Sequence, residues 1–400
     1  MNYLSDRINN LSESETLAMT QKSRELSAQG FDVINLSIGE PDFNTPEFIK
    51  TAAKDAIDKN FTHYPPVPGY PELRLAICKK LKRDNNLDYT PEQIVVSTGA
   101  KHSIANVMLA LVNPGDEVIV PAPYWVSYKE IVKLAEGKSV IIPGGIDNNF
   151  KVTPEQIEAA ITEKTKVLIF SSPCNPTGSV YSKEELFAMA KVLEHHKNIF
   201  IISDEIYEYI NFIGKHESIA QFDFIKDQVI VINGVSKGYA MTGWRIGYIA
   251  APLPIAKACN KLQGQVTSGA CSIAQKASFT AIDTDPKLTP EFKTMLDAFR
   301  ERRDLLLGLL KEIPGIITNT PDGAFYVFMD AKYYFGKTDG TTTIKGSDDL
   351  SMYLLNTAHV ALVPGTAFGD PNCLRFSYAT SKEKITEAVK RIKETLAKFK

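Results

Sequence analysis

The chain has 400 residues, of which 45 are Lys or Arg and 47 are Asp or Glu, so its formal net charge is -2. This balance excludes binding to nucleic acid or to an anionic membrane through bulk positive charge. Hydrophobic residues make up 44% and charged residues 23%, which indicates a globular protein with a real core and excludes disordered, collagenous and coiled-coil classes.

The sequence shows neither a membrane span nor a secretion signal. No apolar run approaches the roughly 18 residues that a span needs, and residues 1–15 lack the hydrophobic core of a signal peptide. The cysteines lie far apart, without the paired spacing of a disulfide framework or a zinc site; they are Cys78, Cys174, Cys259, Cys271 and Cys373. We therefore expect a reduced, cytoplasmic protein without a metal site.

Short β-branched apolar runs alternate with amphipathic stretches up to Trp244. This alternation predicts βαβ units around a mainly parallel sheet, an α/β fold. Helices are expected after Thr45, as N-cap before Pro46, and after the N-cap Ser182. The apolar run Val167–Phe170 should be buried on both faces. Strands are expected at Ile94–Ser97, Glu117–Val120, Ser139–Pro143, Lys166–Phe170, Phe200–Asp204 and Val229–Gly234.

The pattern changes after Trp244. Helical periodicity dominates from Pro254 to about Ile313, and an α+β pattern follows with a closing helix at Ser381–Phe399. Short strands are expected near Phe325–Met329, Ala361–Val363 and Leu374–Ser377. We place a domain boundary near residue 290.

The most informative motif, residues 236–247, directly follows the strand that ends at Gly234. A lysine such as Lys237, next to small residues past a strand end, is shielded from water, which lowers the pKa of its amine and favours a Schiff base. Arg245 offers a fixed cation to a phosphate, with the Ser236 hydroxyl as a second donor. A single lysine is far more often a surface residue, so the combination is what favours chemistry.

Asp204 stands at the carboxyl end of a predicted strand, the edge where open α/β sheets bind ligands. The alternative, a helix cap, is equally good for this residue alone. A lysine and an aspartate on adjacent strand ends are what a pyridoxal phosphate enzyme requires. The lysine carries the cofactor aldehyde as an imine, and the carboxylate keeps the pyridine nitrogen protonated.

The segment Ser97–His102 turns from a strand into a helix through Gly99. The unpaired backbone amides at a helix start attract phosphate. One such turn is weak evidence, since most only change the direction of the chain. Its weight comes from the order of the motifs: phosphate turn, then aspartate, then lysine and arginine.

Three further side chains have two interpretations each. Asn175 either forms an ordinary turn or points its amide at a ligand. Trp125 either fills the core or stacks on a flat ring. Arg375 lies between two apolar residues of a short strand, and a buried arginine there would need a partner such as a substrate carboxylate.

Taken in order, these motifs resemble those of the fold-type I pyridoxal phosphate enzymes, and among them the class I aminotransferases of the aspartate aminotransferase type. The resemblance extends from residues 35–43 to residues 374–377. It implies a mainly parallel sheet flanked by helices, with a smaller α+β domain. The implied large cofactor domain spans residues 46–290, and both chain ends, residues 1–45 plus 291–400, form the small domain.

The resemblance also implies pyridoxal 5'-phosphate as the cofactor. Lys237 would bond its aldehyde and move the proton of the substrate Cα. Asp204 would pair with the ring nitrogen, Tyr207 and Asn175 would hydrogen-bond the phenolic oxygen, and Trp125 would stack on the ring. The motif around Asn175 departs from the family pattern only at flanking positions, Ser171 and Cys174.

The remaining contacts implied by the resemblance concern phosphate, substrate and partner. Phosphate would be held by Gly99, Ala100, Lys101, Ser236 and Arg245. Tyr64 of the partner subunit would reach the same phosphate, which implies a homodimer with shared sites. The substrate α-carboxylate would be held by Gly39, Trp125, Asn175 and Arg375.

Substrate choice follows from a narrower resemblance. The branch that this chain is more similar to uses a lysine at the phosphate turn, here Lys101, and a threonine near the N-terminus, here Thr16, for the side-chain carboxylate. That branch includes enzymes that also act on prephenate. We expect ping-pong transfer between aspartate and 2-oxoglutarate, with prephenate as a further substrate. The alternative role of Lys101 is a plain counter-charge to phosphate.

Other activities on the same fold stay open. An aminotransferase for aromatic amino acids or alanine, or a pyridoxal phosphate lyase, would use the same cofactor residues, because the pocket decides which bond breaks. A non-catalytic regulator is disfavoured, since the aminotransferase pattern leaves no room in the chain for an added basic helix-turn-helix domain.

Overall fold

A seven-stranded sheet forms the centre of the computed structural model, which describes residues 3–400. Its strand order is β2-β8-β7-β6-β5-β3-β4, and β8 runs antiparallel to both of its neighbours while the other pairs are parallel. The strands are β2 Ile94–Ser97, β3 Glu117–Ala122, β4 Lys138–Pro143, β5 Thr165–Ser171, β6 Phe200–Asp204, β7 Val229–Gly234 and β8 Gly247–Ala250. The predicted α/β class and the six predicted strands are confirmed, whereas β8 was not predicted.

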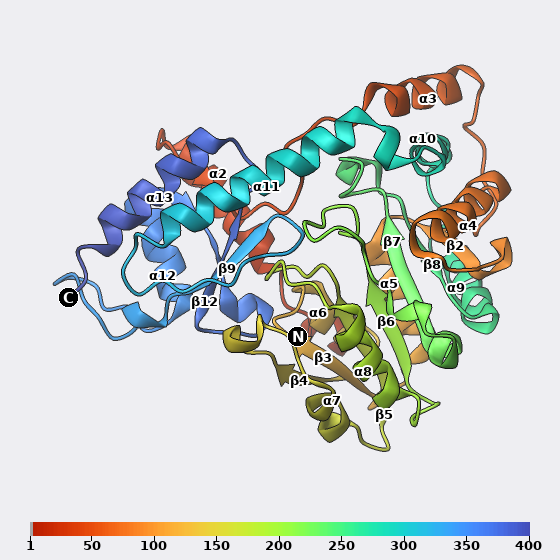
Figure 1. Cartoon of the computed structure of the whole chain (residues 1–400), viewed down its shortest axis with the longest axis horizontal. Helices are drawn as coiled ribbons and strands as arrows, with labels where there is room; N and C mark the ends of the chain where they lie inside the picture. Colours follow the sequence, from red (N-terminus) through yellow and green to blue (C-terminus); the bar gives the residue numbers. More distant parts are fainter. Residues whose placement is uncertain (1–2) are drawn as a thin grey trace.

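Helices cover both faces of this sheet (Figure 1). Along β5, Val167 and Ile169 pack with helices on one face, and Leu168 and Phe170 pack with helices on the other, which confirms the predicted burial on both faces. Alternation of side chains along a strand produces this division. The helices around the sheet are α3 Glu47–Asp58, α4 Pro71–Asn85, α5 Ala100–Leu111, α6 Ser127–Leu134, α7 Pro154–Ala160, α8 Lys183–Leu193, α9 Leu253–Val266 and α10 Ser272–Asp283.

Both ends of the chain meet in a second, smaller core. The parallel pair of β1 and β10 joins Ile34 to Val360, and the antiparallel order β11-β12-β9 forms a three-stranded sheet. The strands are β1 Ile34–Asn35, β9 Tyr326–Asp330, β10 Val360–Ala361, β11 Val363–Pro364 and β12 Cys373–Ser377. The helices are α1 Asp6–Asn9, α2 Glu15–Ala28, α11 Pro290–Leu310, α12 Ser347–Tyr353 and α13 Lys382–Leu396. The predicted domain limits at residues 46 and 290 stay a prediction.

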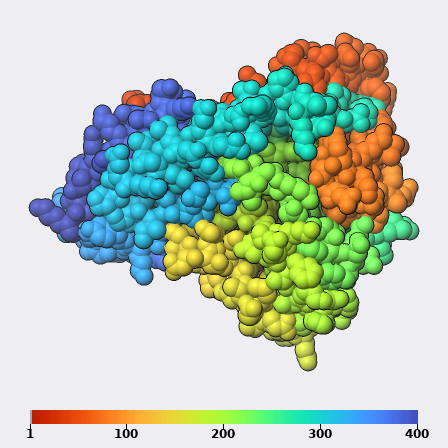
Figure 2. Space-filling view, viewed as in Figure 1, coloured from red at the N-terminus to blue at the C-terminus, as the bar shows by residue number. Residues whose placement is uncertain are grey.

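Helix α11 links the two cores. It crosses from the neighbourhood of α13 to that of α3 and α10 (Figure 1). In the space-filling view, α11 and the residues after it form a continuous band between the blue C-terminal part and the orange segment that contains α4 (Figure 2). The two cores therefore share one long structural element.

One predicted helix start is wrong and one is confirmed. Helix α3 has Pro46 as its N-cap, and the side chain of Thr45 does not cap it. The Thr45 hydroxyl instead donates to the Ala240 carbonyl at 2.7 Å and accepts from Trp244 Nε1 at 3.0 Å. The Thr45 hydroxyl therefore binds groups distant in the chain and not the backbone amides at the start of α3. Ser182 caps α8 as predicted, in a capping box with Glu185.

Across residues 3–400, no helix combines the length and the apolar character needed to cross a membrane. The five cysteines are free thiols. Among the described residues, one buried group could offer metal ligands, and it contains no cysteine: Glu205, Glu208 and His216.

Candidate active site

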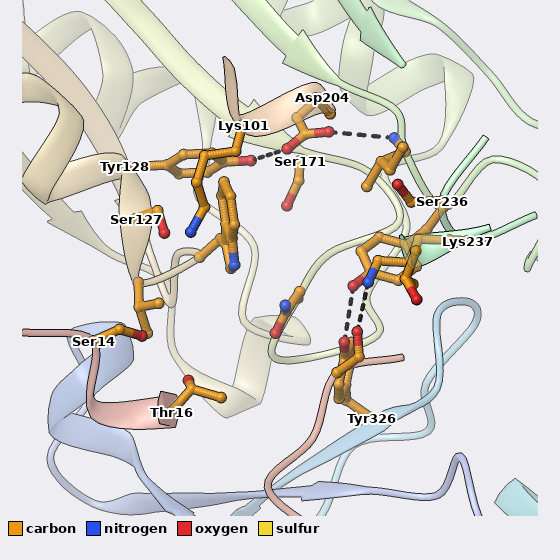
Figure 3. A pocket seen from close by; sticks show the side chains of 18 of the residues that line it. Ser14, Thr16, Lys101, Ser127, Tyr128, Ser171, Asp204, Ser236, Lys237 and Tyr326 are labelled. Carbon is orange, nitrogen blue, oxygen red and sulfur yellow. Dashed lines mark hydrogen bonds between the residues drawn. The ribbon is translucent and has the colours of Figure 1, made fainter. Parts of the chain in front are cut away.

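The sequence motifs meet in a cavity of about 260 Å³ at the carboxyl edge of the large sheet (Figure 3). This is the edge where parallel α/β sheets bind ligands. Loops after β5, β6 and β7, the start of α5, and strands β9 and β12 of the smaller core all contribute to its wall. The predicted site residues in the wall are Thr16, Gly39, Ala100, Lys101, Trp125, Asn175, Asp204, Tyr207, Ser236, Lys237, Arg245 and Arg375.

Lys237 lies three residues past the end of β7, and its amine points into the cavity (Figure 3). Its Nζ donates to the Gly39 carbonyl at 2.5 Å. Burial lowers the pKa of Lys237 to about 8; Glu40 opposes this shift and Arg245 adds to it. The lowered pKa increases the neutral fraction of this amine, the form that acts as a nucleophile and a base. Because the amine is buried in the cavity wall, the alternative of a plain surface lysine is wrong.

Asp204 ends strand β6 and is 4% exposed. Its Oδ2 accepts a hydrogen bond from the Tyr128 hydroxyl at 2.7 Å, and its Oδ1 accepts one from the Ile206 amide at 3.3 Å. Burial raises the pKa of Asp204 to about 6, although both hydrogen bonds oppose the shift. The chain after Asp204 forms turns and no helix, so the carboxylate does not cap one. A cationic ligand group beside it would stabilise the charged form.

Arg375 is 2% exposed on β12 and is not paired with a carboxylate in the described part of the chain. Nη1 donates to Asn175 Oδ1 at 3.0 Å, and Nη2 donates to the Ser37 carbonyl at 2.5 Å. Within residues 3–400, Nε lacks a hydrogen-bond partner. A buried guanidinium surrounded by neutral acceptors keeps its capacity to bind an anion.

The predicted phosphate turn has the geometry of an anion cradle. Gly99 has φ of +82°, and a Cβ at this position would lie 2.3 Å from Arg245 Nη2. Only glycine therefore lets the guanidinium rest on the turn. Helix α5 begins at Ala100, so its unpaired first amides lie beside this cation. Ala100 and Arg245 line the cavity, whereas Gly99 itself does not.

Lys101 and Thr16 approach the cavity from different elements, α5 and α2 (Figure 3). Lys101 Nζ lies 5.0 Å from the centre of the Trp125 ring. Burial lowers the pKa of Lys101, and Arg245 lowers it further. Tyr64 is the one predicted residue far from this arrangement: it is 92% exposed and does not line the cavity of its own chain.

Comparison with known proteins identifies the family. The family model described as "Aminotransferase class I and II" matches residues 32–392. The chain belongs to the class I and II aminotransferases. This aminotransferase is 47% identical to a "Bifunctional aspartate aminotransferase and glutamate/aspartate-prephenate aminotransferase" of Petunia hybrida, over 99% of the chain and 83% of the relative. It is 46% identical to an "Aspartate aminotransferase" of Bacillus subtilis, over 99% of each.

Solved structures of aspartate aminotransferases have the same fold as this chain. The aspartate aminotransferase from Rhizobium meliloti superposes with a TM-score of 0.96 at 40% identity, covering 100% of both chains. The aspartate aminotransferase from Thermus thermophilus with maleate superposes with a TM-score of 0.93 at 39% identity, over 99% of this chain and 100% of that one. These neighbours confirm the predicted fold.

The aminotransferase cavity also contains residues that the sequence did not indicate. Tyr128 lies three positions after Trp125, a helical spacing that could have drawn attention to it. The Tyr326 hydroxyl lies 2.8 Å from that of Tyr207, and it occupies the space that a Cβ on Gly39 would need. No local pattern marks Tyr326, because its partners are more than a hundred residues away in the chain.

Proposed function

We propose that this aminotransferase binds pyridoxal 5'-phosphate and transfers the amino group of aspartate to 2-oxoglutarate by a ping-pong mechanism, with prephenate as a further acceptor. The observation that supports this proposal best is the meeting of three groups in one cavity. These are the amine of Lys237, the buried carboxylate of Asp204 and the guanidinium of Arg375, which has no acidic partner among residues 3–400.

The cavity fits the cofactor group by group. An aldehyde suits the Lys237 amine, since a pKa lowered to about 8 increases its neutral fraction over that of an ordinary lysine, and a protonated ring nitrogen suits the buried Asp204. A phosphate suits the cradle formed by Gly99 and Arg245. The phenolic oxygen would be held by Tyr207 and Asn175, the ring face by Trp125, and the phosphate also by Ala100, Lys101, Ser236 and the partner subunit's Tyr64.

Bound pyridoxal phosphate would accept the electron pair released when the substrate Cα–H bond breaks. The protein supplies the proton transfer and the orientation. Lys237 Nζ, once freed from the cofactor, would take the proton from the substrate Cα as a general base. Arg375 would hold the α-carboxylate with its guanidinium, which fixes the Cα–H bond relative to Lys237.

Lys101 and Thr16 support a substrate with a second carboxylate. Both line the cavity. Lys101 provides a cation, since its Nζ lies 5.0 Å from the centre of the Trp125 ring, which is expected to stack on the cofactor. Maleate, the ligand named for the Thermus thermophilus neighbour, is likewise a dicarboxylate. The proximity of Lys101 to Arg245 favours the second candidate role, a counter-charge to phosphate. Thr16 offers no charge, so the substrate assignment depends mainly on Lys101.

We also propose a homodimer with shared sites. The exposed Tyr64 would then contact the phosphate in the site of the other subunit. Sedimentation of the purified protein at several concentrations tests the dimer, and monomers over the whole range would contradict it. The cytoplasmic location stays a prediction from the sequence.

Borohydride reduction of the holoenzyme, followed by peptide mass mapping, tests the cofactor assignment. The expected result is a stable pyridoxyl adduct on the peptide that contains Lys237. An adduct on another lysine, or none, would overturn the assignment. Release of carbon dioxide and alanine from aspartate would instead indicate a lyase on the same fold.

A further inference from the structure

A second group of charged side chains is buried within and beside the segment Asp204–Glu208, and it does not line the cavity. We call it the buried quartet: Lys80, Glu205, Glu208 and His216, which are 1%, 1%, 5% and 8% exposed. Glu205 and Glu208 alternate along the chain with Asp204 and Tyr207, which do line the cavity. One short segment therefore faces the cavity with one pair of side chains and the quartet with the other.

The carboxylate of Glu205 is saturated with donors. Its Oε2 lies 2.9 Å from His216 Nε2. Its Oε1 accepts from the Ser203 hydroxyl at 2.9 Å and from the Ser218 hydroxyl at 2.6 Å. The carboxylate thus ties the segment to β6 on one side and to the loop at residues 216–218 on the other.

Glu208 is held by helix α4. It forms an ion pair with Lys80 through Oε1, and its Oε2 accepts from Asn85 Nδ2 at 3.2 Å. Lys80 Nζ also donates to Asn85 Oδ1 at 2.9 Å, which closes a ring of three side chains. The Lys80 amine lies 3.8 Å from Asp84, but Asp84 is already paired with Arg83.

With both carboxylates ionised, the charges of the quartet balance when His216 is protonated. Glu205 and Glu208 contribute two negative charges and Lys80 one positive charge, so a neutral imidazole would leave one buried charge uncompensated. Burial lowers the pKa of His216, but Glu205 and Glu208 outweigh burial and the opposing Lys80, and the net shift is upward. The ligand atoms of Glu205, Glu208 and His216 all lie within 4.8 Å of one another, as for a metal, yet Lys80 already supplies a cation at this place.

We propose that the buried quartet, with His216 as an imidazolium, consists of positioning residues that hold the segment Asp204–Glu208 and thereby aim Asp204 and Tyr207 at the cofactor. The segment consists of turns and has few regular backbone partners, one of which joins the Glu205 amide to the Ile232 carbonyl at 2.9 Å. Side-chain anchors must therefore fix it. The inference rests on the proposed role of Asp204 and Tyr207 in holding pyridoxal phosphate.

Nitrogen NMR of histidine-labelled holoenzyme tests the charge state of the quartet. At about pH 8, well above the ordinary histidine pKa of about 6.5, the signal absent from His216→Gln should be that of an imidazolium. Glu205→Gln should return it to the neutral form. A neutral His216 in the unaltered protein would overturn the proposal, as would one equivalent of bound metal that a chelator removes.

Three variants test the positioning role: Lys80→Met, Glu208→Gln and the double variant. Each single variant leaves a buried charge unpaired, so the midpoint of thermal unfolding should fall by about 5 °C or more, and the double variant should recover most of this loss. The single variants should also alter the visible circular dichroism of bound pyridoxal phosphate. They should lower kcat about tenfold with KM for aspartate changed less than about twofold.

Lys393→Met is the matched control, since Lys393 forms an exposed ion pair with Glu312 at 2.7 Å; all readouts should stay unchanged. If Lys80→Met does not fold, His216→Gln takes its place with the same readouts. Lost stability with an unaltered cofactor spectrum and kcat would show a merely structural role and overturn the proposal. If the unaltered protein binds no pyridoxal phosphate, the proposed function fails, and so does the proposed link between the quartet and the cofactor. The NMR measurement still tests the charge state of His216 in that case.

Discussion

Tyr128 on helix α6 donates its hydroxyl to Oδ2 of Asp204, at the end of strand β6, across 2.7 Å. This hydrogen bond stabilises the carboxylate in surroundings that otherwise favour the neutral acid, since burial raises the pKa of Asp204 to about 6. The tyrosine therefore supports the charge that, in the proposed function, would pair with the ring nitrogen of pyridoxal phosphate.

Replacing Tyr128 by Phe should raise the pKa of Asp204 above about 6, because the bond to Tyr128 lowers it. As the solution is acidified, the affinity of the apoenzyme for pyridoxal phosphate should then begin to fall at a higher pH than it does in the unaltered protein. A hydrogen bond to a charged group contributes about 1.5–3 kcal/mol, so affinity should fall roughly tenfold or more near neutral pH. Fluorescence titration of the apoenzyme with pyridoxal phosphate at several pH values measures this affinity.

Tyr353→Phe is the control for this variant. Tyr353 donates to Asp339 Oδ2 at 2.6 Å, a similar bond in a place that does not line the cavity. Its loss should leave cofactor affinity and its pH profile unchanged. Equal effects of the two variants would mean that the Tyr128 bond has no special link to the cofactor.

Lys237 should make the apoenzyme more stable as pH rises from about 8 toward 10.5. Its pKa in the fold is about 8, below the ordinary value of 10.5, so within this window the unfolded chain binds more protons than the folded one. The free energy of unfolding therefore increases with pH in this window, and this increase is absent below about pH 8. Lys237→Met should remove this slope from urea unfolding curves measured at several pH values. An unchanged slope would contradict the lowered pKa.

Arg375→Lys should raise the KM for aspartate by tenfold or more. The variant keeps the positive charge but loses the planar fork that binds a carboxylate through two hydrogen bonds, worth about 1.5–3 kcal/mol. Steady-state kinetics measure the change. Arg391→Lys, in which the altered arginine binds Asp32 at the surface, is the control and should leave KM unchanged.

Lys101→Ala should selectively weaken the use of aspartate. The ratio of kcat/KM for aspartate to that for alanine or phenylalanine should fall about tenfold, since a charged hydrogen bond to the side-chain carboxylate is lost. A panel that also includes glutamate and prephenate measures the ratio. A variant that retains its preference for dicarboxylic over neutral substrates, with weaker cofactor binding, would assign Lys101 to the phosphate instead.

Most of the large sheet could be predicted because its strands are short, β-branched apolar runs, as in Val167–Phe170. Strand β8, Gly247–Ala250, could not, since its sequence Gly-Tyr-Ile-Ala contains one β-branched residue and its pairing with β2 is distant in the chain. The start of α3 failed for a similar reason. The Thr45 hydroxyl found partners in Ala240 and Trp244 that no local capping pattern reveals.

The candidate site divides in the same way. Lys237, Asp204 and Arg375 stand at strand ends or within a short strand, where a charged residue contrasts with its apolar neighbours and can be recognised. Tyr326 is an aromatic residue in an apolar strand, which looks like core until its contact with Tyr207 is known. The quartet was not predicted either, because a buried ion pair such as Lys80 with Glu208 depends on tertiary packing alone.

The half-reaction of the holoenzyme with aspartate, in the absence of any oxoacid, tests the central claim most directly. Absorption of bound pyridoxal phosphate should convert to that of pyridoxamine phosphate, with one oxaloacetate released per active site, and 2-oxoglutarate should reverse the change with formation of glutamate. Absorption that does not change with aspartate, or release of alanine and carbon dioxide in place of oxaloacetate, would contradict the proposed amino-group transfer.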